Sequence, residues 1–318
     1  WKTGGAPTWL TGSYDPDLNL LYWGVGNPSP AFQPETRPGD NLYSDSVIAL
    51  NADSGNLVWH FQFTPNDEHD WDAAQIPVLV DTDWKGKPRK LMLWANRNAF
   101  FYVLDRETGE LLLSKPFSKQ NWAREIDSSG RPVLIPEARV TTTGTVTWPG
   151  PAGATNWHSP SYNPQTGLMY VPVVMRGDIV FKRPNAIKHE PGRSFAGSGY
   201  DSMVGKKTFL TAVRAIDPRT GDVRWEHRHP PISQLWRWGG LVSTAGGIIF
   251  SGHDTRLFVL DAFSGKKLWD LDVGGRVNSS PITHAVADNQ RLVIAAGRSL
   301  FSIGLPDARD LDTGPNVP

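Results

Sequence analysis

Four carboxylates lie within six residues in the segment 67–72, which reads DEHDWD. Carboxylates this close repel one another unless water or a cation neutralises them, so the default interpretation is an acidic surface loop. His69 and Trp71 alternate with Asp70 and Asp72, however, and aromatic side chains of this size are unusual on a solvated loop tip. A hard divalent or trivalent cation, which prefers oxygen ligands, accounts better for the segment.

Asp70 and Asp72 are the candidate metal ligands of this segment. If residues 69–72 are extended, side chains two positions apart point to the same side, so both carboxylates could face one ion. The alternative for Asp72 is a cap on a turn.

Two other segments carry polar groups that could join such a site. Asn27 stands between Gly26 and Pro28 at the end of an apolar run, where the chain turns sharply and aims an amide. Taken alone, this segment is a turn in most proteins. Arg97 precedes a second apolar run and would ordinarily form a surface ion pair.

A repeated phrase predicts the elements that must position these residues. It consists of a hydrophobic strand, an Asp, a Gly-containing turn and a second strand, and it occurs at 47–55, 102–109, 213–221 and 258–265. The Asp positions are 53, 105, 217 and 261, and three copies are closed by Trp59, Trp225 and Trp269. Each unit is a hairpin that must stack on a neighbour to bury its apolar face, and the Trp suits that docking.

The spacing of the repeats predicts an all-β fold. The long interval between Asp105 and Asp217 has room for one more unit, and the segment 161–172, which matches 13–23, is assigned to it. Roughly 45–55 residues per unit fits a propeller blade of four strands, so about five blades are expected. Helical periodicity is nearly absent; residues 123–127 could form one helical turn at most.

Composition excludes several classes of function. Hydrophobic residues make up 39% of the 318 positions, 32 basic groups balance 32 acidic ones, and Cys is absent. The neutral balance indicates no nucleic-acid partner, and the lack of Cys excludes disulfides and thiolate metal sites. No apolar run approaches the roughly 18 residues of a membrane-spanning helix. Trp1-Lys-Thr is neither an initiator Met nor a signal peptide, so we expect a processed chain or a fragment.

Three stretches interrupt the strand pattern. Residues 115–157 and 176–207 are expected to be insertions on one face of the propeller, where such segments either shape a pocket or decorate the surface. Residues 305–318 are expected to form a C-terminal tail after a propeller domain at 1–304, and no haem-attachment motif is present.

Together the motifs resemble those of the pyrroloquinoline quinone (PQQ)-dependent alcohol dehydrogenases, of the methanol and ethanol dehydrogenase type. The segment 9–16 is similar to the one whose Trp forms the floor beneath the quinone ring, and 24–30 to the one whose Asn ligates the metal. The segment 65–71 is similar to the one that delivers the catalytic Asp, and 96–98 to the one whose Arg contacts the quinone oxygens. The resemblance covers nearly the whole chain.

The resemblance implies a role for each matching residue. Asp70 would accept the hydroxyl proton of a primary alcohol as hydride leaves its carbon, and Arg97 would stabilise negative charge on the reduced quinone. Trp9 would hold the flat cofactor by stacking, and Asn27 and Asp70 would ligate a metal that acts as a Lewis acid. Further cofactor contacts are implied for Asn156, Trp157, Trp238, Gly239 and Val277.

The resemblance also bears on the metal. Within the family an uncharged residue two positions after the catalytic Asp resembles the calcium enzymes, whereas an Asp, here Asp72, resembles the lanthanide enzymes. A further negative ligand suits a trivalent ion better than Ca²⁺. The expected cofactors are therefore PQQ with Ca²⁺ or a lanthanide ion, with the lanthanide favoured.

The chain departs from the family in what it lacks. The family propeller has eight blades, and its N-terminal half carries a metal-ligating Glu and an adjacent Cys pair that are not visible here. We therefore expect a C-terminal portion whose partners are the missing half of the propeller, a small alcohol, and a cytochrome c or membrane quinone as electron acceptor. A periplasmic location is implied by the resemblance alone.

Two other functions are compatible with the repeats. A non-enzymatic propeller could bind proteins, as the repeat proteins of outer-membrane assembly do, and a degenerate quinoprotein could keep the fold without turnover. The order and spacing of Asn27, Asp70 and Arg97 favour the dehydrogenase over the scaffold.

Overall fold

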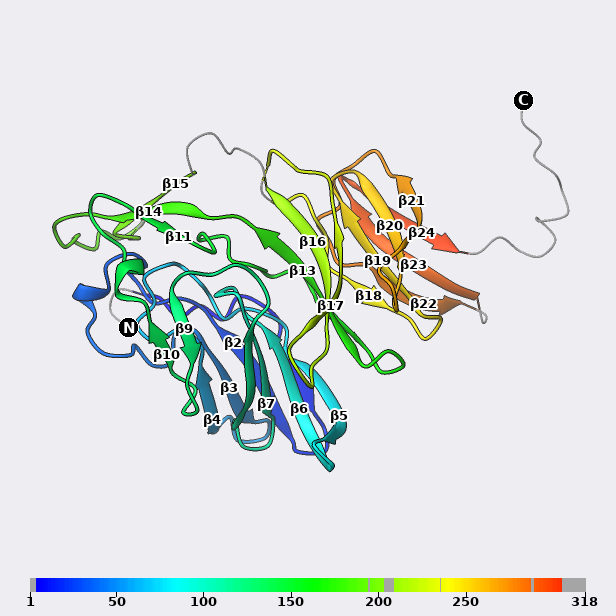
Figure 1. The fold of residues 1–318 in the computed structure, drawn as a ribbon, viewed down its shortest axis with the longest axis horizontal. Coiled ribbons are helices and arrows are strands. Elements are labelled where there is room, and N and C mark those ends of the chain that lie inside the picture. Colours follow the sequence, from blue (N-terminus) through cyan, green and yellow to red (C-terminus); the bar gives the residue numbers. More distant parts are fainter. Residues whose placement is uncertain (1–3, 194, 203–208, 235, 287–288, 305–318) are drawn as a thin grey trace, which may run out of the picture.

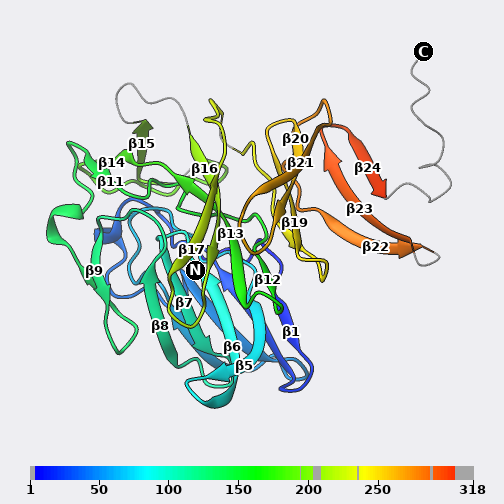
Figure 2. The ribbon, with the colours of Figure 1, turned by 45° about the vertical axis from the view of Figure 1, so that its right-hand side comes forward.

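The computed structural model describes residues 4–193, 195–202, 209–234, 236–286 and 289–304. Antiparallel sheets follow one another along an arc, from β1–β4 in blue to β22–β24 in orange and red (Figure 1). The prediction of a partial propeller is confirmed: four sheets have four strands, and the last has three among the described residues. Figure 2 shows the last two sheets side by side.

The first two sheets are each built from consecutive strands in sequence order. The first contains β1 (Ser13–Asp15), β2 (Leu20–Val25), β3 (Ser46–Asn51) and β4 (Leu57–Gln62). The second contains β5 (Val78–Trp84), β6 (Lys87–Ala95), β7 (Phe100–Asp105) and β8 (Leu111–Pro116).

The remaining repeats follow the same antiparallel order. The third sheet contains β12 (Ser161–Asn163), β13 (Leu168–Met175), β16 (Leu210–Ile216) and β17 (Val223–Arg228). The fourth contains β18 (Val242–Ser243), β19 (Ile248–His253), β20 (Arg256–Asp261) and β21 (Lys267–Asp272), and the fifth contains β22 (Ile282–Val286), β23 (Asn289–Ala296) and β24 (Ser299–Gly304).

The predicted assignment of the fifth repeat is wrong. The segment 161–172 is not a unit of its own, because β12 and β13 share a sheet with the strand that ends before Asp217. An insertion between β13 and β16 separates the two halves of this sheet in the sequence, which is why they looked like two units. The fifth unit is the sheet β22–β24.

The turn chemistry confirms three of the four repeat Asp residues and corrects the fourth. Asp105, Asp217 and Asp261 each end the third strand of a sheet or follow it directly. Each carboxylate accepts the backbone N–H two residues further on, at 3.0–3.2 Å, and Asp261 also accepts the next one, from Ser264, at 2.8 Å. In the first sheet Asn51 Oδ1 has the corresponding role and accepts the N–H of Ser54, three residues further on, at 3.0 Å. The equivalent of the repeat Asp is therefore Asn51 and not Asp53, because the shared Gly sits four residues after it.

Hydrophobic clusters lie between successive sheets, and two tryptophans help to hold neighbouring sheets together. Trp59 Nε1 donates to the Arg106 carbonyl at 3.2 Å, and Trp225 Nε1 donates to the Ala262 carbonyl at 3.2 Å. The turn glycines of the next sheet lie against these rings: a Cβ on Gly265 would be 2.5 Å from Trp225 Cε3. The predicted role of these two tryptophans is confirmed.

Trp269 occupies the same register but remains 43% exposed. It lines an apolar groove between the fourth and fifth sheets, together with Phe250, Leu292 and Ile303. The position that would correspond to Arg106 and Ala262 follows Gly304, outside the described residues. In the second sheet Leu113 stands in the Trp register.

The insertions form two small sheets. The first insertion holds β9 (Ala123–Ile126), β10 (Pro132–Leu134) and β11 (Thr145–Thr147), and the second holds β14 (Asp178–Lys182) and β15 (Ser198–Ser202). Residues 123–126 are therefore a strand and not the helical turn considered from the sequence, because they pair with β10. β11 pairs with β14, so the two insertions are joined.

Helical structure is limited to two short 3₁₀ turns in the described ranges, η1 (Pro34–Thr36) and η2 (Pro136–Ala138). No helix in these ranges is long and apolar enough to cross a membrane. The predicted tail, 305–318, and residues 203–207 of the second insertion lie outside the described residues.

Candidate functional site

Asp70 lies in the loop between β4 and β5. It is the one partly exposed residue in an otherwise buried stretch, 67–75, and its backbone is left-handed, with φ of +64°. Asp67 closes this loop, since its carboxylate accepts the His69 and Trp71 amides at 3.0 Å each. The His69 and Trp71 rings stack with centroids 4.1 Å apart. The segment is thus not extended, although the prediction that Asp70 and Asp72 could face one ion assumed an extended segment.

Asp72 connects the three predicted segments. Its Oδ1 accepts the Asn27 backbone N–H at 2.7 Å, and its Oδ2 accepts Arg97 Nη1 at 2.5 Å. Gly26 permits this approach, because a Cβ there would be 2.4 Å from Asp72 Oδ1. Ala73 N, which donates to the Val25 carbonyl at 3.3 Å, fixes the loop to the end of β2.

Arg97 follows β6 and is buried. Besides Asp72, it binds the Pro151 carbonyl through Nη2, and its own carbonyl accepts Ala154 N at 2.9 Å. The first insertion is thereby held against the site. Asn156 lies in the same loop, where its amide donates to the Ala152 carbonyl at 2.8 Å.

Electrostatics set Asp70 apart from an ordinary surface acid. Burial raises the pKa of Asp70 to about 7; the Arg97 charge opposes this shift, and the charges of Asp72 and Asp67 add to it. A carboxyl with a pKa near neutrality can take up and release a proton at physiological pH.

Trp9 lies beside the Asn27 segment. The chain at 6–8 pairs with it through Ala6 N to the Asn27 carbonyl at 2.7 Å and Gly26 N to the Pro7 carbonyl at 2.8 Å. The Trp9 side chain is 47% exposed, so an indole face is available for a flat ligand.

The remaining predicted cofactor residues gather in a second group. Trp238 pairs with His253 in an isolated bridge, and Gly239 N donates to the Gly252 carbonyl at 2.8 Å. Val277 is fully buried against Gly252, where an added Cβ would be 2.0 Å from its Cγ1. Trp157 belongs to this group through an aromatic cluster.

That cluster contains a residue which the sequence reasoning missed. His158 stacks on Trp157 with centroids 3.9 Å apart and lies 4.8 Å from Trp238. Both of its ring nitrogens are buried without a hydrogen-bond partner among the described residues, and burial lowers the pKa of His158 to about 3. No repeat or family motif marks this position; only its place between two tryptophan segments could have drawn attention to it.

Two further residues near the loop, the half-buried Arg37 and the buried Asp45, were given no role in the sequence analysis. The Arg37 guanidinium binds the Pro30, Ala31 and Asp67 carbonyls, and Asn41 Oδ1 at 2.6 Å. Asp45 is fully buried, and no described residue donates a hydrogen bond to either of its oxygens. Burial and the charges of Asp67 and Asp72 raise its pKa well above the ordinary range. Arg37 had a weak sequence signal, the Asn four residues later.

The fit of a cofactor and a metal can be judged from donors and acceptors. Arg97 Nε and Trp238 Nε1 are buried donors that have no partner in the part of the chain that the structure describes, and a planar acid with carbonyl and carboxylate oxygens would require such donors. In the described ranges no three His, Cys, Asp or Glu side chains are grouped so as to hold a metal ion. Asn27, Asp70 and Asp72 could therefore supply only part of a coordination shell.

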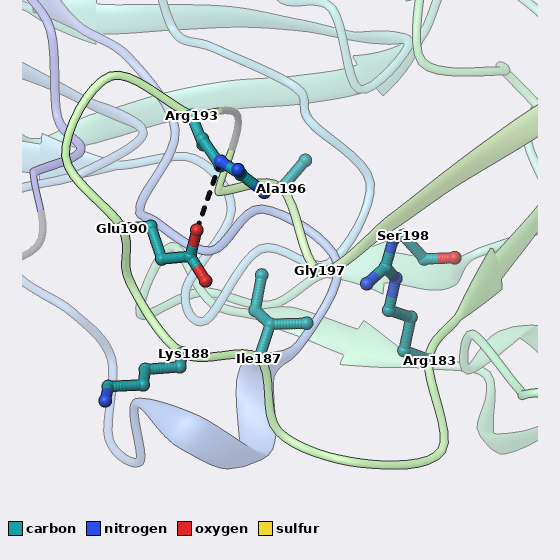
Figure 3. A pocket seen from close by; sticks show the side chains of 8 residues that line it. All are labelled: Arg183, Ile187, Lys188, Glu190, Arg193, Ala196, Gly197 and Ser198. Atoms are coloured by element: carbon teal, nitrogen blue, oxygen red, sulfur yellow. Dashed lines mark ion pairs between the residues drawn. The ribbon is translucent and has the colours of Figure 1, made fainter.

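A separate pocket of about 400 Å³ lies on the second insertion and does not contain Asn27, Asp70 or Arg97. Figure 3 shows Arg183, Ile187, Lys188 and Arg193 around it, with Arg193 paired to Glu190. The insertion is fastened to the chain after Asn27 by Gln33, which donates to the carbonyl groups of residues 183 and 185.

Comparison with known proteins agrees with the resemblance seen in the sequence. Residues 1–115 match the family model for the "Glucose/ethanol/alcohol dehydrogenase, beta-propeller domain". Residues 211–311 match the model for "Outer membrane protein assembly factor BamB".

Relatives of known activity match along most of this chain. The quinoprotein alcohol dehydrogenase PedH of Pseudomonas putida is 38% identical over 309 residues, which are 93% of this chain and 50% of PedH. The lanthanide-dependent methanol dehydrogenase of Methylacidiphilum fumariolicum is 36% identical over 306 residues, 92% of this chain and 48% of that protein.

Solved structures agree with these matches. The quinohemoprotein alcohol dehydrogenase of Comamonas testosteroni superposes with a TM-score of 0.85 at 34% identity, over 93% of this chain and 45% of that one. A europium-containing methanol dehydrogenase superposes with a TM-score of 0.84 at 34% identity, over 92% of this chain and 51% of that one. The chain spans about half the length of the relatives it matches, and as such a portion it belongs to the family of PQQ-dependent alcohol dehydrogenases.

Proposed function

We propose that this chain provides the proton-accepting side of an active site that oxidises a primary alcohol to an aldehyde with PQQ and a metal ion. The observation that carries the proposal is the Asp70 carboxyl: it is partly exposed, has a pKa of about 7, and lies beside the linked Asn27, Asp72 and Arg97. Those are the residues that the family motifs associate with the metal and the quinone.

Each residue has a role that its surroundings support. Asp70, which no hydrogen bond or ion pair holds in the described part of the chain, accepts the hydroxyl proton of the alcohol. Arg97 offers positive charge, and its free Nε–H can donate to an oxygen of the cofactor. Trp9 presents an indole face for stacking. Further cofactor contacts would come from Asn156, Trp157, Trp238, Gly239 and Val277.

The bound groups would supply hydride acceptance, by PQQ, and Lewis acidity, by Ca²⁺ or a lanthanide. Asn27, Asp70 and Asp72 are the metal ligands that this chain would offer. The amide of Asn27 donates to the Pro28 carbonyl at 3.1 Å, which leaves its oxygen as an acceptor. Asp72 is paired with Arg97, so metal binding by Asp72 competes with that ion pair.

The wider context of the activity is part of the same proposal. The described residues up to Gly304 would form the propeller portion, and the rest of the propeller would complete the site. Electrons pass to a cytochrome c or a membrane quinone in the periplasm. The names of relatives such as the 1-butanol dehydrogenase (cytochrome c) of Thauera butanivorans support this kind of acceptor.

The test is dye-linked alcohol oxidation with added PQQ and either Ca²⁺ or La³⁺, on a polypeptide extended to the length of the relatives. Asp70→Asn should lower kcat by about 10²-fold or more, because it removes the proton acceptor. Asp83→Asn, at an exposed position near the end of β5, is the matched control and should leave kcat unchanged. Equal rates in the two variants would remove Asp70 from the mechanism.

The metal needs its own comparison. Asp72→Ala should abolish activity with La³⁺ and spare activity with Ca²⁺, because the trivalent ion depends more on the extra negative ligand. Equal loss with both ions would show that Asp72 acts through Arg97 instead.

A protein-binding scaffold is the second candidate, and the match of residues 211–311 to the BamB model favours it. It predicts that the extended polypeptide binds no PQQ and oxidises no alcohol with either metal. Quenching of the Trp fluorescence by PQQ distinguishes the two, and an inactive protein that still binds PQQ would be a degenerate quinoprotein.

A further inference from the structure

We propose that Asp67 is a positioning residue for Asp70: its buried carboxylate imposes the left-handed backbone at residue 70 and so aims the Asp70 side chain out of the buried loop. The inference deepens the proposed function, on which the chemical role of Asp70 rests. The geometric part of the inference stands without it.

The Asp67 carboxylate brackets Asp70. Its Oδ1 accepts the amide of His69 and its Oδ2 accepts the amide of Trp71, each at 3.0 Å, so the residues on both sides of Asp70 are bound to one group. Asp67 is 1% exposed, and hydrogen bonds to a carboxylate are strong when water is excluded.

The backbone of Asp70 needs such a constraint. A φ of +64° is unfavourable for a residue with a Cβ, and the chain places no glycine there. The neighbours of Asp70 face inward: Trp71 is fully buried, and its Nε1 donates to the Gly150 carbonyl at 3.0 Å. Between two inward-facing residues, the left-handed conformation lets Asp70 alone reach the surface.

The backbone of Asp67 is in turn held by Arg37. The Arg37 guanidinium binds the Asp67 carbonyl and also ties down the Pro30 and Ala31 carbonyls that follow the Asn27 segment. The two segments that carry Asn27 and Asp70 are therefore linked through Arg37 and Asp67. The pKa of Asp67 lies below the ordinary range because, although burial raises it, bonds from His69 and Trp71 and the charge of Arg37 outweigh burial.

Asp105 provides a matched comparison. Its carboxylate also accepts two backbone amides, from Glu107 at 3.0 Å and Thr108 at 3.2 Å, and it is 5% exposed. In that turn the positive φ falls on Gly109, which has no Cβ. Asp105 therefore stabilises a turn that its sequence favours, whereas Asp67 enforces one that its sequence resists.

A double-mutant cycle on stability tests the constraint without any catalysis. With Asp67 present, the folding equilibrium constant of Asp70→Gly should be at least about fivefold larger than that of Asp70→Ala, because Ala has a Cβ that disfavours the left-handed backbone and Gly has none. In the Asp67→Ala background this ratio should fall to about one or reverse. In the Asp105→Ala background it should persist. A ratio that is the same with and without Asp67 would overturn the proposal.

Asp67→Asn guards against a variant that does not fold. It keeps one acceptor oxygen and loses the other, so the ratio between Asp70→Gly and Asp70→Ala should lie between the two extremes. An unchanged ratio in Asp67→Asn, with a folded protein, also counts against the constraint.

Binding of Tb³⁺, followed by Trp-sensitised luminescence of the extended polypeptide, tests the consequence for the side chain. Asp67→Asn should weaken binding by about tenfold or more while Asp105→Asn leaves it unchanged. If Asp67→Asn leaves Tb³⁺ affinity unchanged, Asp67 does not position the carboxylate, and the proposal is wrong. If the wild type binds no Tb³⁺, the metal site of the proposed function fails, and the stability cycle still decides the role of Asp67.

Discussion

His158 makes the stability of the protein sensitive to acid in a way that can be calculated. Its imidazole is 1% exposed, neither nitrogen has a partner within the described ranges, and burial lowers its pKa to about 3. An unfolded His has a pKa near 6.5, so between about pH 6.5 and pH 3 the unfolded chain binds a proton that the folded chain does not. Stability is therefore full above pH 6.5 and falls as the pH decreases.

The size of the effect follows from linkage. Each pH unit below 6.5 removes about 1.4 kcal/mol, so at about pH 4.5 His158 alone lowers the free energy of unfolding by about 3 kcal/mol. His158→Phe keeps an aromatic ring among Trp157 and Trp238 and removes the two unpartnered nitrogens. We expect it to be neutral or stabilising by about 1–3 kcal/mol at about pH 7.5, and to gain about 3 kcal/mol more at pH 4.5.

Urea unfolding followed by far-ultraviolet circular dichroism, at both pH values, measures this difference. His284→Phe, at an exposed position on β22, is the control and should change neither value by more than about 0.5 kcal/mol. Other groups titrate alike in wild type and variant, so the change in the difference reports His158. Parallel pH dependence in wild type and His158→Phe would refute the neutral buried imidazole.

Three further predictions test how the sheets are joined. Trp59→Ala should cost about 3–5 kcal/mol in urea unfolding, whereas Trp269→Ala, at the same register but 43% exposed, should cost about 1 kcal/mol; equal costs would contradict the docking role. Gly265→Ala should cost about 2–4 kcal/mol and alter the fluorescence of Trp225, because Gly265 has a φ of +70° and a Cβ there would meet the Trp225 indole. Arg106→Ala should cost about 3–5 kcal/mol at neutral pH by leaving its buried carboxylate partner unpaired, and the cost should shrink below about pH 4; a pH-independent loss in thermal unfolding would argue against the ion pair.

The Arg106 prediction rests on a buried pair with Asp15. Burial alone would raise the pKa of Asp15, but the bond and charge of Arg106 outweigh it, so the pKa lies below its ordinary value. A carboxyl of this kind stabilises the fold above its unfolded pKa and loses that contribution as the pH falls through its folded pKa. Nothing in the sequence pairs these residues, which are far apart in the chain.

The repeats were predictable because their chemistry is local. A turn of the type Asp-x-x-x-Gly needs only an acceptor at the strand end and a residue that tolerates positive φ, and both are visible at Asp105 and Gly109. The same local logic failed at Asn51, because an amide oxygen serves as well as a carboxylate and Asp53 drew attention away from it. It failed again where an insertion split the third sheet between β13 and β16.

The candidate site was predictable only in its parts. Residue types and motif resemblance indicated Asn27, Asp70, Asp72 and Arg97, and the structure brings the last two together with the Asn27 backbone. The sequence did not show that both carboxylate oxygens of Asp72 accept hydrogen bonds, one from the Asn27 N–H and one from Arg97, because the alternating pattern suggested an extended segment.

The left-handed residue at position 70 explains that failure. The φ of +64° at Asp70 breaks the extended conformation that the prediction for Asp70 and Asp72 assumed. Asp72 turns inward to Arg97, and Asp70 turns outward. The two carboxylates thus differ although they are near neighbours. Asp72 forms an ion pair with Arg97, whereas burial, with the charges of Asp72 and Asp67 against that of Arg97, raises the pKa of Asp70 to about 7. In the proposed function the alcohol must reach the partly exposed Asp70 carboxylate, so the proposed constraint at Asp67 would bear on activity as well as on stability.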